Sequence, residues 1–195
     1  MMIWCRTEFI PWMLNLDCER VIFIAGNHDF CCENPNWFDD FYDNVKEANG
    51  GEDTEKIVYL ENESYLYKGK RFFGCPYSSI PGWAFSTKTG DKNGYRAIEP
   101  GVDILLVHQA PKLNNLGTSN IGSASERDFG SKSLLKVIQD RKPKLVLCGH
   151  IHTGSHKLNI DEHGIQYYNV SIKNESYQIA YDPLIINIYE EGLYI

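Results

Sequence analysis

The chain has 195 residues, 43% of them hydrophobic and 23% charged, which is typical of one globular domain with a full apolar core. Its formal net charge of −7 argues against a broad nucleic-acid surface, because such a surface needs clustered Lys and Arg. No apolar run reaches the length of a membrane span, and the first residues lack a signal-peptide pattern. The six cysteines show no C-x-x-C spacing, which predicts reduced thiols and a cytoplasmic protein.

The first half of the chain alternates between helical and strand patterns. Apolar residues at helical spacing predict a helix that is capped by Thr7 and runs to Leu14, with Pro11 tolerated near its first turn. A buried strand is predicted next, over 21–25, and then a short helix over 37–45. Three further strands are predicted from β-branched and aromatic content, over 57–60, 64–67 and 71–75.

The second half contains two long polar stretches, 86–101 and 117–133, which predict loops of the kind that often wall a functional site. A buried strand over 104–107 lies between them. A helix around Leu134 ends before Pro143, and strands are predicted over 145–148, 165–170 and 184–189. Helices interleaved with buried strands predict an α/β layered fold, with residues 1–195 forming a single domain.

Histidines follow three of the predicted buried strands. The tetrad Gly26-Asn27-His28-Asp29 follows strand 21–25, His108 follows strand 104–107, and Gly149-His150-Ile151-His152 follows strand 145–148. Ligands collect at the carboxyl ends of strands in open α/β sheets, and imidazole nitrogens bind Zn, Mn, Fe or Ni. The three motifs together indicate a metal site. For each motif alone, a hydrogen-bonded turn or a pair of surface histidines is the alternative.

In order and spacing, the motifs strand-G-N-H-D, strand-H-x-x-P and strand-G-H-x-H resemble those of the calcineurin-like metallophosphoesterases. Segments such as 73–77 and 130–135 are similar to the branch of metallophosphoesterase-domain proteins found in animals and bacteria. The resemblance covers nearly all of residues 7–190. It implies a four-layer αββα sandwich and a two-metal hydrolase in which metal-activated hydroxide attacks a phosphate ester, in first place a phosphodiester.

The resemblance also implies roles for individual residues. Asn27, His108 and His150 are then ligands of one metal ion and His152 is a ligand of a second, about 3.5–4 Å away. His28 contacts the phosphate and assists the leaving group. Separately, the aromatic residues Tyr77 and Trp83 are candidates for the wall of a substrate pocket, with a hydrophobic cluster beneath the loop as the alternative.

Two motifs of the family pattern are absent from the chain, a strand that ends in D-x-H and a strand that ends in G-D. The four implied ligands that remain are all neutral, so two divalent cations would repel each other strongly. We therefore expect this chain to hold at most one metal ion, weakly, and to turn over substrate near background. A helix that feeds a buried strand without a preceding strand predicts the same gap, because a β-α-β unit needs about 30 residues.

The gap is expected to reflect a gene start assigned too late, a fragment, or a naturally shortened relative. The gap is also expected to expose the apolar surface beside strand 21–25, which would favour association between chains. The number of chains in such an assembly stays open. The main functional hypothesis is hydrolysis of a small phosphate ester. The alternatives are a shortened, non-catalytic relative that binds one metal or a protein partner, and a closed structural metal site.

Overall fold

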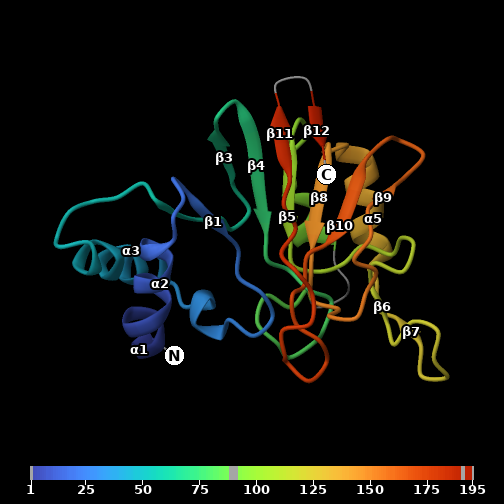
Figure 1. Ribbon diagram of the computed structural model, residues 1–195, viewed down its shortest axis with the longest axis horizontal. Coiled ribbons are helices and arrows are strands. Elements are labelled where there is room, and N and C mark those ends of the chain that lie inside the picture. The colour runs from blue at the N-terminus through green and yellow to red at the C-terminus, as the bar shows by residue number, and fades with distance from the viewer. Residues whose placement is uncertain (1, 88–91, 190–191, 195) are drawn as a thin grey trace.

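Six strands form the central sheet of the computed structural model, which describes residues 2–87, 92–189 and 192–194 (Figure 1). The strand order is β3-β4-β5-β8-β10-β9. The inner strands run parallel and the two edge strands run antiparallel to their neighbours. The bounds are β3 (Ser64–Tyr67), β4 (Lys70–Cys75), β5 (Ile104–Val107), β8 (Leu145–Cys148), β10 (Gln166–Asn169) and β9 (Asn159–Ile160).

A second, parallel sheet consists of β1 (Val21–Phe23) and β2 (Ile57–Tyr59). It meets the central sheet at Gly74 of β4, where a Cβ atom would lie 2.3 Å from the Cβ of Leu60 and 2.8 Å from Cγ2 of Ile24. The two sheets therefore approach closely at this point. Two antiparallel hairpins complete the strands: β6 (Thr118–Ser119) with β7 (Arg127–Asp128), and β11 (Asn187–Tyr189) with β12 (Gly192–Tyr194).

Helices cover the outer sides of the two sheets, which produces the order helix, sheet, sheet, helix (Figure 1). The helices beside the small sheet share an aromatic-rich core with it, in which Trp37 and Phe41 stack at 4.8 Å between ring centroids. A second core lies against the central sheet and includes Leu134 and Ile138 of α5. The helical elements are α1 (Met2–Trp4), η1 (Cys5–Phe9), α2 (Ile10–Asn15), η2 (Phe30–Glu33), α3 (Trp37–Ala48), α4 (Lys92–Arg96) and α5 (Lys132–Arg141).

This arrangement confirms the predicted α/β fold, while several predicted boundaries differ. The first helical segment begins at Met2, not after Thr7, whose hydroxyl donates to the carbonyl of Ile3 (3.1 Å) from within the helix. A π-helical turn precedes Pro11, because proline lacks the N–H that the regular helical ladder requires there. The predicted loop 86–101 contains α4, and its residues 88–91 lie outside the described residues.

Three further features bear on the sequence-based expectations. All six cysteines are free thiols in the structure, and Cys75 and Cys148 are buried. Within the described ranges, no helix is long and apolar enough to cross a membrane. The three residues of β1 are half-buried, so their surface is only partly open to solvent.

Candidate metal and substrate site

The three histidine motifs meet at the carboxyl ends of strands that belong to two different sheets. β5 and β8 pair in parallel with Val107 opposite Cys148, so His108 and His150 emerge from the same edge of the central sheet. The backbone N–H of Gly149 donates to the carbonyl of His108 (3.2 Å), which fixes the two strand ends to each other. Asn27 comes from the other sheet, four residues beyond the end of β1.

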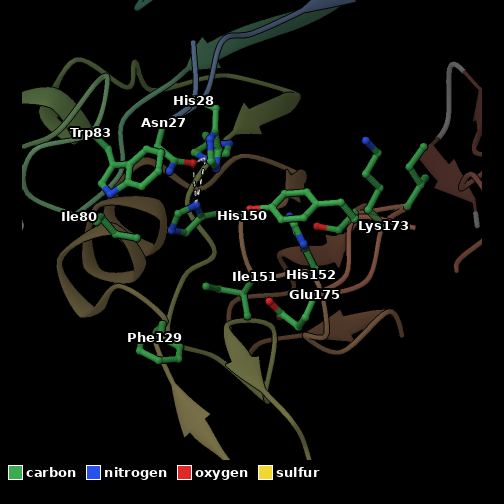
Figure 2. Close-up of a pocket in the computed structure, with 14 residues that line it drawn as sticks. Asn27, His28, Ile80, Trp83, Phe129, His150, Ile151, His152, Lys173 and Glu175 are labelled. Carbon is green, nitrogen blue, oxygen red and sulfur yellow. Dashed lines mark hydrogen bonds between the residues drawn. The ribbon is translucent and has the colours of Figure 1, made fainter. Parts of the chain in front are cut away.

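Three side-chain atoms converge at this point (Figure 2). Nε2 of His108 lies 2.8 Å from Oδ1 of Asn27 and 3.0 Å from Nδ1 of His150. Oδ1 of Asn27 and Nδ1 of His150 are 3.2 Å apart. His150 reaches this position with a left-handed backbone (φ 69°), a conformation that costs a non-glycine residue energy and often accompanies a functional site.

The convergent histidines are neutral at neutral pH. Burial lowers the pKa of His108 to about 3 and that of His150 to about 4, and neighbouring imidazoles add to both effects. A neutral imidazole keeps a lone pair on one ring nitrogen, which is the form that binds a metal ion. The site therefore offers donor atoms without first losing a proton.

The donor set fits a single divalent cation. With metal–ligand bonds of about 2.1 Å, donors at right angles lie about 3.0 Å apart, close to the three separations observed. Within the described residues, no three His, Cys, Asp or Glu side chains gather into a metal-binding group, so the third donor here is the amide of Asn27. The nearby carboxylate of Asp29 instead accepts from the backbone N–H of Gly26 (2.7 Å) and braces the turn.

The predicted residues His28 and His152 line the same cavity. His28 is exposed and its ring meets Trp83 edge-on, with 4.6 Å between centroids. Nδ1 of His152 bonds the carbonyl of Asn174 (3.0 Å), which leaves Nε2 as the nitrogen available to a ligand. The role of His152 as a ligand of a second metal stays a prediction.

The cavity has a volume of about 470 Å³. In Figure 2, Asn27, His28, Trp83 and Ile80 lie toward one side, and His152, Lys173 and Glu175 lie toward the other. The polar donors and the apolar walls therefore share one space. The lining residues are Asn27, His28, Ile80, Trp83, His108, Phe129, His150, Ile151, His152, Ser171, Ile172, Lys173, Glu175 and Tyr177.

Tyr77 does not share this cavity with Trp83, contrary to the expectation that both residues wall one pocket. Its side chain lines a second cavity of about 550 Å³ together with Phe85. The physical reason is the bond from Nδ2 of Asn62 to the Tyr77 hydroxyl (2.7 Å), which holds the ring against the hydrophobic cores.

The sequence motifs did not identify Asn169, whose side chain bonds the backbone of the Gly-His-Ile-His loop. Asn169 is fully buried at the end of β10, and its Nδ2 donates to the carbonyls of Ile151 (2.8 Å) and Leu116 (2.9 Å). Its Oδ1 accepts from the backbone N–H of Ser171 (3.0 Å). The available signal was a polar amide at the end of a strand, at the same sheet edge as the histidines.

The chain belongs to the calcineurin-like phosphoesterase family, because residues 6–154 match the sequence profile of that family. Members of this family hydrolyse phosphate esters with divalent metal ions. The match extends over all of the convergent donors and His152.

Individual relatives agree with this assignment. The human metallophosphoesterase domain-containing protein 1 is 28% identical over 198 residues, which cover 93% of this chain and 59% of that protein. The mouse protein of the same name gives the same values. A UPF0046 protein of Caenorhabditis elegans is 28% identical over 196 residues, which cover 89% of this chain and 63% of that protein. The chain thus spans less than two thirds of the length of these curated relatives.

The crystal structure of TT1561 of Thermus thermophilus is similar in fold, with a TM-score of 0.48 and 13% sequence identity. The similarity covers 77% of this chain and 62% of that chain.

Proposed function

We propose that this protein hydrolyses a phosphodiester with the help of one divalent cation, Mn²⁺ in the first place, held by Asn27, His108 and His150. The observation that carries the proposal is the convergence of three neutral donor atoms within 3.2 Å of one another, inside a cavity and in a phosphoesterase family. The cavity of about 470 Å³ is large enough to hold a phosphodiester with small organic groups.

Different residues of the chain bind the substrate and donate a hydrogen bond or a proton to it. When bound, a divalent cation withdraws charge from the phosphoryl group and makes water a stronger nucleophile at neutral pH. Lys173 adds a positive charge to the cavity lining, which also holds the carboxylate of Glu175. The ring of His28 is held by the edge of Trp83 at the open side of the cavity, where it donates a hydrogen bond or a proton to the leaving oxygen.

A non-catalytic, metal-binding role is the second candidate, because the donor set carries no charge. Two imidazoles and one amide compensate none of the cation's two positive charges, which predicts weak binding. We therefore expect slow turnover that needs a high Mn²⁺ concentration. If the cation binds without turnover, the second candidate is correct.

Hydrolysis of bis(p-nitrophenyl) phosphate with Mn²⁺ tests the proposal. We expect turnover by the unmodified chain only slightly above the rate without protein, and its loss in His150→Ala or Asn27→Ala, because each substitution removes a donor atom. The matched controls His163→Ala and Asn44→Ala change side chains of the same types that do not line the cavity, and they should retain the activity. Normal turnover by the double variant Asn27→Ala/His150→Ala would reject the site.

The cysteines support a further proposal, that the protein works in a reducing compartment such as the cytoplasm. All six are free thiols, and four of them, Cys5, Cys18, Cys31 and Cys32, are at least partly accessible, whereas a disulfide-forming compartment favours pairing of accessible thiols. Mass determination of the protein isolated from cells under alkylating conditions tests this, with six alkylated thiols expected after denaturation.

A further inference from the structure

Exposed apolar side chains gather around the histidine cavity. Single exposed apolar residues are ordinary on a protein surface, but a group that rims a cavity indicates a ligand-binding surface. Phe129 is 54% exposed and Ile80 is 37% exposed, and both line the cavity from different loops. The other exposed apolar residues of the lining are Trp83, Ile172 and Tyr177.

One buried side chain links the loops that carry Ile80 and Phe129. Gln109 is 1% exposed. Its Oε1 accepts from the backbone N–H of Ser79 (3.1 Å) and from the Ser79 hydroxyl (3.3 Å). Its Nε2 donates to the backbone carbonyl of Phe129 (3.1 Å). The amide thus joins the residue next to Ile80 to the backbone of Phe129.

We propose that Gln109 is a positioning residue that holds Ile80 and Phe129 as two walls for the organic group of the phosphate ester. This inference rests on the proposed function of the cavity. Because both walls are apolar, the ester group that they bind is apolar or aromatic. Gln109 does not itself line the cavity, so its effect on the ligand passes through the two loops.

Because Gln109 adjoins His108, the test must distinguish an effect of the substitution on the apolar walls from an effect on the metal site. A general disturbance at Gln109 could also weaken phosphate binding. Such a disturbance would reduce the binding of every phosphoryl ligand equally. Loss of the walls reduces only the binding of ligands that carry a large apolar group.

The experiment compares phenylphosphonate with methylphosphonate, two non-hydrolysable probes, by calorimetry in the presence of Mn²⁺. Gln109→Met keeps the length of the side chain and removes its hydrogen bonds. We expect it to weaken phenylphosphonate about fivefold, because this ligand must then order the two loops that form its walls, and to leave methylphosphonate unchanged. Gln139→Met on α5 is the matched control and should change neither affinity.

The double variant Ile80→Ala/Phe129→Ala removes the walls themselves at exposed positions and serves if Gln109→Met does not fold. We expect the same selective loss for phenylphosphonate, and no further loss when Gln109→Met is added. Equal losses for both probes, no loss, or full additivity of the three substitutions would overturn the inference. If neither probe binds to the unmodified chain, the proposed function is rejected, and this inference is rejected with it.

Discussion

The imidazole of His108 lies against the backbone of Gly26 so closely that no side chain fits between them. A Cβ atom at Gly26 would lie 2.6 Å from both Cε1 and Nδ1 of His108. Gly26 belongs to the small sheet's loop and His108 to the central sheet, so this contact is where the two halves of the donor set are brought together. The glycine is required here for space.

Gly26→Ala should displace the imidazole of His108 and weaken Mn²⁺ binding about tenfold or more. Loss of the contacts that orient a metal ligand typically lowers metal affinity by this amount. Gly149→Ala is the matched control from the other tetrad. Its Cβ would lie 3.4 Å from Oγ of Ser171, an ordinary contact, so we expect little change. Calorimetric titration with Mn²⁺ measures both, and equal affinities for the two variants would contradict the steric account.

Asn169→Ala should destabilise the protein by about 2–3 kcal/mol, because it leaves buried carbonyls without their donor. The carbonyls concerned belong to Ile151 and Leu116. Urea unfolding at equilibrium measures the loss. Asn44→Ala, at a half-buried position of α3, is the control, and a loss at Asn169 no larger than at Asn44 would show that this buried amide does not support the loop.

The metal-free protein should lose stability as the pH falls below about 6.5. Burial holds the pKa of His108 at about 3 and that of His150 at about 4, both below the ordinary value of 6.5. Between these values the unfolded chain binds more protons than the folded chain, so acid favours unfolding. Above the ordinary value both states are neutral at these residues, and their contribution no longer depends on pH.

Urea unfolding in the presence of a chelator, between about pH 7.5 and 5.5, tests this pH dependence. His150→Gln should flatten the dependence, because it removes one of the two groups. An equally steep dependence in the variant would show that other groups cause it.

Cys75 and Cys148 should resist alkylation in the native protein. Burial raises the pKa of each thiol to about 12, so the reactive thiolate is scarce and shielded. Cys18 is exposed and should react readily with iodoacetamide. Mass spectrometry of peptides, with and without urea, separates the sites. Native labelling of Cys75 or Cys148 at the rate of Cys18 would show that the core opens readily.

The donors could be located from the sequence because each follows an apolar strand, and ligands collect at the carboxyl ends of strands in α/β folds. The strand ends indicated a metal site, and the family resemblance implied Asn27, His108 and His150 as ligands of one ion. The structure brings these three side chains within hydrogen-bond distance of one another. The sequence did not show that Asn27 arrives from a separate two-stranded sheet. Strand patterns mark burial, and they carry no information on which sheet a strand joins.

The supporting amides Gln109 and Asn169 could not be identified, because they act on backbone groups of distant loops. A side chain that bonds a carbonyl needs no particular partner residue, so it leaves no motif. The predicted start of the first helix at Thr7 was wrong for a related reason. The hydroxyl of a threonine can donate to a carbonyl within a helix, here that of Ile3, as readily as it can cap a helix.

The most direct test of the metal site is pulsed electron paramagnetic resonance of the protein loaded with Mn²⁺. The account predicts one bound ion with magnetic coupling to imidazole nitrogens, and loss of that coupling in the double variant His108→Ala/His150→Ala. A coupling unchanged by the double variant, or an ion without nitrogen ligands, would contradict the assignment of Asn27, His108 and His150 as the metal site.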